Sequence, residues 1–65
     1  MYYVFQGTDR QMDTVKECKT FEEALKLFEK IKNDREGYSK FYNIITSIED
    51  ECGNILEEYV NYRRR

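Results

Sequence analysis

The hydrophobic positions of this chain follow a helical period in the middle and a strand-like period on either side. Apolar side chains recur at the spacing of one helical stripe at Phe21, Ala24, Leu25, Phe28 and Ile31. Thr20 can accept hydrogen bonds from the first backbone N–H groups, and Glu23 can reach back to the Thr20 N–H. The pattern predicts one amphipathic helix from about Phe21 to Asp34 or Arg35, which Gly37 ends.

A pair of strand-like segments joined by a polar turn lies on each side of this helix. The predicted strands are 1–6, 13–19, 41–48 and 55–62, and the turns are 7–12 and 49–54. Gly53 can supply the positive φ of a bulged hairpin loop. The fold class is therefore α+β, a β-β-α-β-β domain with one antiparallel four-stranded sheet and a single helix packed on one face.

The order of the strands stays open, because either hairpin could lie centrally. The segment 13–19 has Val15 as its one strongly apolar side chain and several charged ones, which favours an edge position. The expected core consists of Val4, Phe5, Phe21, Ala24, Leu25, Phe28, Ile31, Ile44, Ile48, Leu56 and Val60. The second face of the sheet would then expose Tyr and Ile side chains, which favours a partner or a homodimer over a monomer.

The length and composition describe a small single domain. We expect residues 1–62 to form it and the arginines at 63–65 to form a basic tail. Charged residues make up 37% of the chain, but the clear periods argue against disorder. The chain has no long apolar run and no basic segment leading into an apolar one, so we expect a cytoplasmic protein. In that compartment Cys18 and Cys52 are expected to be reduced rather than disulfide-bonded.

The residue types argue against catalysis and against a metal or other cofactor. The chain has no histidine, its three glycines are isolated, and it has no Cys-x-x-Cys pair. Glu51 disfavours the thiolate of its neighbour Cys52 through like charge. The run 49–51 lacks the ligand spacing of a calcium loop and is expected to be a solvated turn. We therefore expect a protein that is not an enzyme.

The charges are unevenly divided along the chain. The net charge is −2, yet residues 41–62 contain no Lys or Arg. Their five acidic residues are Glu49, Asp50, Glu51, Glu57 and Glu58. Such an acidic hairpin can recognise a basic, nucleic-acid-binding protein by imitating phosphate charge. Small inhibitors from phages and mobile elements, including anti-CRISPR proteins, use this logic, and the likeness is one of size and charge only.

A second candidate surface lies around the C-terminus. Aromatic and basic side chains that could grip a nucleic acid, or contact a partner from the sheet face, are Tyr42, Tyr59, Tyr62, Arg63, Arg64 and Arg65. The nearby glutamates would repel a phosphate backbone. The sequence thus favours a non-catalytic interaction module, a small regulator or inhibitor that binds a protein. An accessory nucleic-acid-binding protein and a structural homodimer subunit are the alternatives.

Overall fold

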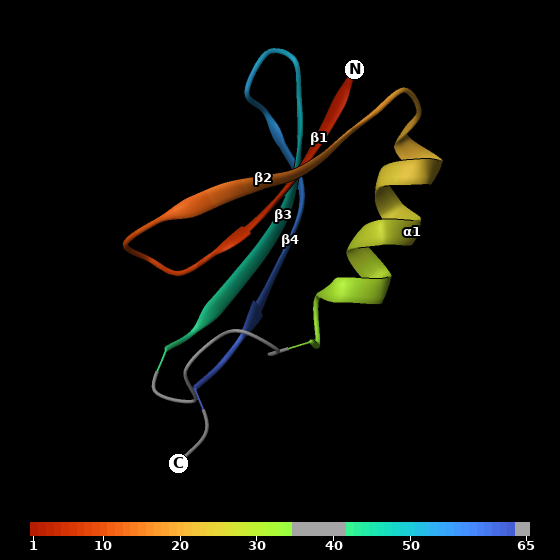
Figure 1. Cartoon of the computed structure of the whole chain (residues 1–65). Coiled ribbons are helices and arrows are strands. Elements are labelled where there is room, and N and C mark those ends of the chain that lie inside the picture. The colour runs from red at the N-terminus through yellow and green to blue at the C-terminus, as the bar shows by residue number, and fades with distance from the viewer. Residues whose placement is uncertain (35–41, 64–65) are drawn as a thin grey trace.

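Four antiparallel strands form one open sheet, and a single helix packs on one of its faces (Figure 1). The computed structural model describes residues 1–34 and 42–63. Along the chain the elements are β1 (Tyr2–Gly7), β2 (Met12–Cys18), α1 (Phe21–Ile31), β3 (Ile44–Asp50) and β4 (Ile55–Asn61). This confirms the predicted β-β-α-β-β fold.

The sheet order is β2-β1-β3-β4, so the first strand of each hairpin lies in the centre. β2 lies at one edge, as its charged composition predicts, and β4 lies at the other. β3 carries Ile44, Ile45 and Ile48, the most apolar run of the four strands, which suits a central strand. Both hairpins therefore contribute one central and one edge strand, an arrangement that the sequence left open.

The predicted start of the helix is confirmed. The Glu23 backbone N–H donates to Thr20 Oγ1 at 3.2 Å, and the Ala24 N–H donates to the Thr20 carbonyl at 3.3 Å. The helix ends earlier than predicted, at Ile31, and the Asp34 N–H donates to the Ile31 carbonyl in a turn. Asn and Asp side chains compete for backbone groups and so favour turns over helix, which explains the early end. Gly37 lies outside the described residues.

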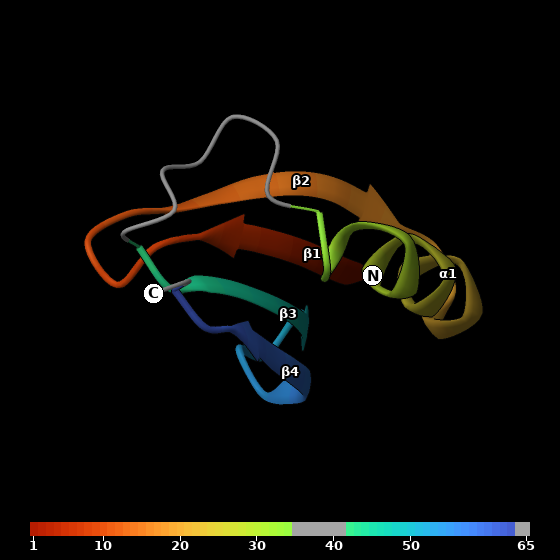
Figure 2. The same cartoon turned by 90° about the horizontal axis from the view of Figure 1, so that it is seen from below.

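The core lies between α1 and the face of β1, β2 and β3 that it covers (Figure 2). Its buried side chains are Val4, Cys18, Ala24, Phe28 and Ile48, and Tyr2, Phe21, Leu25, Leu27 and Ile31 pack around them. The Gln6 amide donates to the Ile31 carbonyl at 3.0 Å and to Thr46 Oγ1 at 3.1 Å. Gln6 thereby satisfies a carbonyl at the C-terminal end of the helix and ties that end to the sheet.

Three expected core residues lie elsewhere. Phe5 and Val60 are half-buried on the face that α1 does not cover, because neighbouring strand residues point to opposite faces. Leu56 is 41% exposed, and its expected core position was wrong. It is the extra residue of a bulge, since Ile48 pairs with Glu57 while Glu49 pairs with Ile55.

The turns of the two hairpins need their glycines for different reasons. A side chain at Gly7 would collide with the backbone carbonyl oxygen of Gln11, which accepts the N–H of Thr8 across the first turn. Gly53 has a φ of 85°, the left-handed conformation predicted for the second turn. Both hairpins therefore close tightly. The predicted strand at 41–48 is displaced in the structure, since β3 extends to Asp50, and Phe41 lies outside the described residues.

Lys32 joins the end of α1 to the edge strand β4. Its ammonium group lies 5.6 Å from the centre of the Phe28 ring and 5.1 Å from the centre of the Tyr59 ring. Lys32 Nζ also lies 2.9 Å from Glu29 Oε2. Cation–π contacts with two rings, one on the helix and one on β4, hold the edge strand to the rest of the domain.

Replacing Phe28 by alanine should lower the free energy of unfolding by about 3–5 kcal/mol, because its ring is 3% exposed and fills the centre of the core. Urea denaturation of the purified variant measures this loss. Leu56→Ala is the control, and its effect should stay within about 0.5 kcal/mol because Leu56 is exposed. A Phe28→Ala variant as stable as the wild type would contradict the helix packing described here.

Replacing Lys32 by methionine should destabilise the domain by about 0.5–1 kcal/mol, because the methionine keeps the apolar stem but loses the charge. Thermal unfolding would show this, with Lys30→Met as the control on the exposed side of the same helix turn. Equal stability of the two variants would mean that Lys32 contributes only packing.

Candidate functional site

The face of the sheet turned away from α1 combines an apolar centre with carboxylates. We call it the outer sheet face. Strand register places three rows of side chains across the four strands on this face: Glu17, Tyr3, Glu49 and Ile55; Thr14, Phe5, Ser47 and Glu58; and Met12, Gly7, Ile45 and Val60.

The apolar centre of the outer sheet face is partly self-covered. The rings of Tyr3 and Phe5 lie 6.4 Å apart, centre to centre, along β1. Ser47 is only 3% exposed although no helix covers it, because the side chains around it are large. Ile45 and Val60 are half-buried beside them. The centre is therefore a packed surface that still offers apolar area to a partner.

Three carboxylates surround this centre, and its strand positions include no Lys or Arg. Glu17 and Glu49 are the cross-strand neighbours of Tyr3, one from β2 and one from β3. Glu58 is the neighbour of Ser47 on β4. Side chains in such pairs lie within about 5 Å of one another at Cβ, so the three negative charges act on one small area.

The structure divides the five predicted acidic residues. Glu49 and Glu58 lie on the outer sheet face, whereas Glu57 pairs with Ile48 and so lies on the opposite, helix side of β4. Asp50 and Glu51 lie at the end of the β3–β4 hairpin, where both have partners. The predicted acidic hairpin is thus not one continuous surface.

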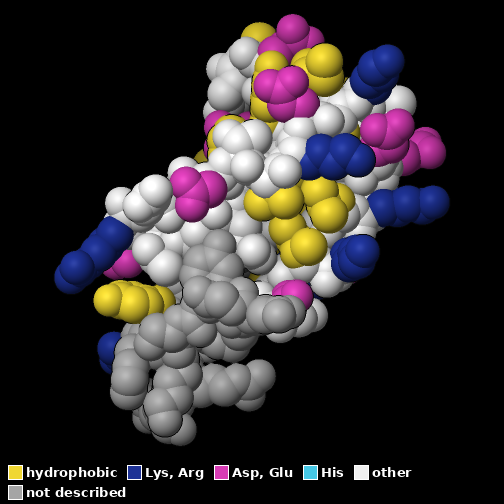
Figure 3. Space-filling view, viewed as in Figure 1, with side chains coloured by type: hydrophobic (Ala, Val, Ile, Leu, Met, Phe, Trp, Pro, Cys, Tyr) yellow, Lys and Arg dark blue, Asp and Glu magenta, His cyan; other side chains and the backbone are white. Residues whose placement is uncertain are grey.

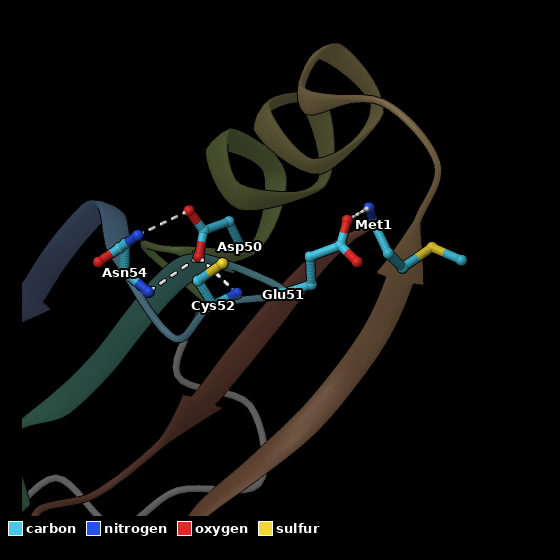
Figure 4. A network of polar contacts seen from close by, with 5 residues as sticks. All are labelled: Met1, Asp50, Glu51, Cys52 and Asn54. Atoms are coloured by element: carbon cyan, nitrogen blue, oxygen red, sulfur yellow. Dashed lines mark hydrogen bonds and ion pairs between the residues drawn. The ribbon is translucent and has the colours of Figure 1, made fainter.

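Asp50 holds the hairpin turn together (Figure 4). Its Oδ1 accepts the backbone N–H groups of Cys52 and Asn54, each at 2.9 Å, and its Oδ2 accepts the Asn54 side-chain amide at 3.1 Å. Hydrogen bonds from the Asn54 backbone and side chain, and then from Cys52 and Gly53, lower the pKa of Asp50 below its ordinary value of 3.8. The role of Asp50 is structural.

Glu51 lies close to the N-terminal end of the chain. Its Oε1 is 3.0 Å from the Met1 ammonium group, and both groups are exposed (Figure 4). Exposed ion pairs contribute little to stability, because water screens them. This pair nevertheless compensates the charge of Glu51, which reduces its value for a partner.

The tyrosines of the second predicted surface are also separated. Tyr59 lies on the helix side, against Lys32. Tyr42 and Tyr62 lie just outside β3 and β4, where the Arg63 backbone N–H donates to Asn43 Oδ1 at 2.7 Å. Tyr62 is 72% exposed and Arg63 is also exposed. Arg64 and Arg65 lie outside the described residues.

Sequence reasoning missed Glu17, Tyr3 and Phe5 as site residues. Glu17 was interpreted as an edge charge, and the two aromatic residues as part of a strand. Their alternation along each strand gives the face of each residue relative to its neighbours. Only the strand order brings Glu17 and Glu49 to either side of Tyr3.

The side of the molecule with α1 and β2 toward the viewer carries mixed charges. Figure 3 shows hydrophobic side chains gathered in the middle of this view, with basic and acidic side chains around them. A shallow depression on α1 is lined by Glu22, Leu25, Lys26 and Glu29. Opposite charges alternate there, so it favours neither an anionic nor a cationic partner.

Neither a metal centre nor a membrane span is found in the part of the chain that the structure describes. In residues 1–34 and 42–63, no three His, Cys, Asp or Glu side chains are grouped so that they could hold a metal ion. No helix within these ranges is long and apolar enough to cross a membrane. Cys18 is buried and Cys52 exposed, and both are free, as predicted.

No family model matches this chain, and neither a curated protein nor a solved structure matches it. Its function must therefore be inferred from its own residues.

Asp50 should titrate below 3.8 in an NMR pH titration of its carboxyl carbon. Because its pKa is lower in the folded state, the stability it contributes is complete above its unfolded value and is lost as the pH falls through the folded value. Asp50→Ala should remove this part of the acid sensitivity and loosen the turn, whereas Glu49→Gln should leave the turn intact. An ordinary titration of Asp50 would show that the turn is not held as described.

Proposed function

We propose that this protein is a non-catalytic binding module, a small regulator or inhibitor that binds a basic protein through the outer sheet face. The observation that carries the proposal is the set of three carboxylates, Glu17, Glu49 and Glu58, around an apolar centre with no Lys or Arg in the same rows. Nucleic-acid-handling proteins present basic surfaces and are the class of partner that this chemistry fits.

The two parts of this face would contribute differently to binding. Tyr3, Phe5, Ile45 and Val60 offer apolar and aromatic area, which forms the centre of most protein interfaces. The carboxylates would steer a basic partner and set its orientation, and salt would weaken this contribution. Affinity should therefore fall with salt, while the apolar contacts should persist.

A second copy of the chain suits the outer sheet face less well. Two such faces in contact would bring six carboxylates together, and their strand positions supply no cation. Like charges placed against one another in an interface disfavour that pairing. The charge pattern therefore favours a different protein as the partner, and the homodimer subunit becomes the weaker hypothesis.

Direct nucleic-acid binding is the second candidate function. The exposed Tyr62 beside the exposed Arg63 supports it, since an aromatic ring can stack on a base and an arginine can contact a phosphate. Glu58 on the same strand opposes it. Contacts from the tail should be few and strongly dependent on salt.

Neutralising the outer sheet face tests the proposal. The triple variant Glu17→Gln, Glu49→Gln and Glu58→Gln should capture at least about tenfold less of the basic partner from a lysate of the source cells at low salt. The matched control is Glu22→Gln, Glu23→Gln and Glu29→Gln, which removes the same charge from α1. Quantitative mass spectrometry of the captured proteins measures the difference.

The proposal would fail if both triple variants captured the same partner equally well. Loss of capture on deletion of residues 63–65, with nucleic acid as the recovered material, would instead support the second candidate. Circular dichroism of each variant confirms that the fold is kept.

A further inference from the structure

The two edges of the sheet differ in how well they could accept another strand. In β2 a bulge at Val15 interrupts the register, since Val4 pairs with Lys16 while Phe5 pairs with Thr14. In β4 the bulge lies near the start, and residues 57–61 pair with 48–44 without interruption. Bulges protect edges because they break the row of backbone groups that a new strand would use. The longer regular edge belongs to β4.

The edge of β4 is also the more open one toward the helix layer. α1 packs over β1, β2 and β3, and the helix side of β4 is reached by Lys32 at Tyr59. Every residue from Ile55 to Tyr59 is exposed, and Ile55 is the most exposed apolar residue of the strand at 58%. A long exposed edge with apolar side chains is a template for strand pairing.

The charges of β4 identify the occupant. Glu57 points to the helix side and Glu58 to the outer sheet face, and β4 carries no other charged residue. Two copies paired through this stretch would cluster four glutamates without a cation. An extended segment in which Lys or Arg alternates with apolar residues would instead place a cation beside a glutamate and an apolar side chain beside Val60 or Tyr59.

We propose that β4 binds an extended, basic segment of the partner as a fifth strand of the sheet. The inference rests on the proposed function and gives its mode of binding, because Glu58 and Val60 belong both to β4 and to the outer sheet face. The added strand would continue that face, so one partner could contact the edge and the face together. Main-chain hydrogen bonds would supply affinity, and the side chains would supply specificity.

The test uses a capped synthetic peptide of about six residues that alternates lysine with valine. Its twin has the same side chains but N-methyl groups on alternate backbone amides, which blocks strand pairing and keeps the charge. The unmethylated peptide should slow hydrogen exchange of the β4 amides that point outward, and leave the amides of β2 unchanged. The methylated twin should bind about tenfold more weakly or worse, because several backbone hydrogen bonds are lost.

Each other outcome overturns strand addition and says something different about the proposed function. Equal binding of both peptides, without protection of β4, would mean that the outer sheet face binds cations by charge alone, and the proposed function would stand. Binding of neither peptide would overturn strand addition, while capture by the triple glutamine variant would decide the proposed function separately. Protection of β4 that grows with protein concentration alone, together with a dimer in sedimentation, would make a second copy the occupant.

Discussion

One helix can cover only one face of a four-stranded sheet, and the rest of this structure depends on that constraint. α1 spans Phe21–Ile31 and packs over three strands, so the alternate side chains of every strand must remain on a face without a second layer. The chain responds by packing Tyr3 against Phe5 and by burying Ser47 among its neighbours. The uncovered face is therefore ordered and partly apolar, which makes it suited to contact with another protein.

Local signals in the sequence predict the elements well. Thr20 and Glu23 give the helix start, the charges of 13–19 give an edge strand, and Gly53 gives the second turn, because each depends on residues close in sequence. The exposed Leu56 was not predicted, since the bulge that exposes it arises from pairing between β3 and β4. The same holds for Phe5 and Val60, which a sequence pattern cannot assign to one face before the strands are ordered.

The candidate site was predicted less completely for a related reason. The acidic residues of the second hairpin are adjacent in sequence, but alternation sends Glu57 and Glu58 to opposite faces. Asp50 and Glu51 are engaged by the turn and by the N-terminal ammonium group. Glu17 comes from the first hairpin and joins Glu49 only because β1 lies between β2 and β3. Sequence composition locates charge along the chain, whereas the pairing of strands locates it in space.

The central position of β1 and β3 has a consequence for how the chain folds. Each hairpin and the helix can form from neighbouring residues, but the pairing of Tyr2 with Asp50 and of Gly7 with Ile45 joins distant parts of the chain. Closing such a long loop costs entropy before any contact between the hairpins compensates for it. The meeting of the two hairpins is thus the slow step, and until it occurs β1 and β3 both expose an unpaired edge.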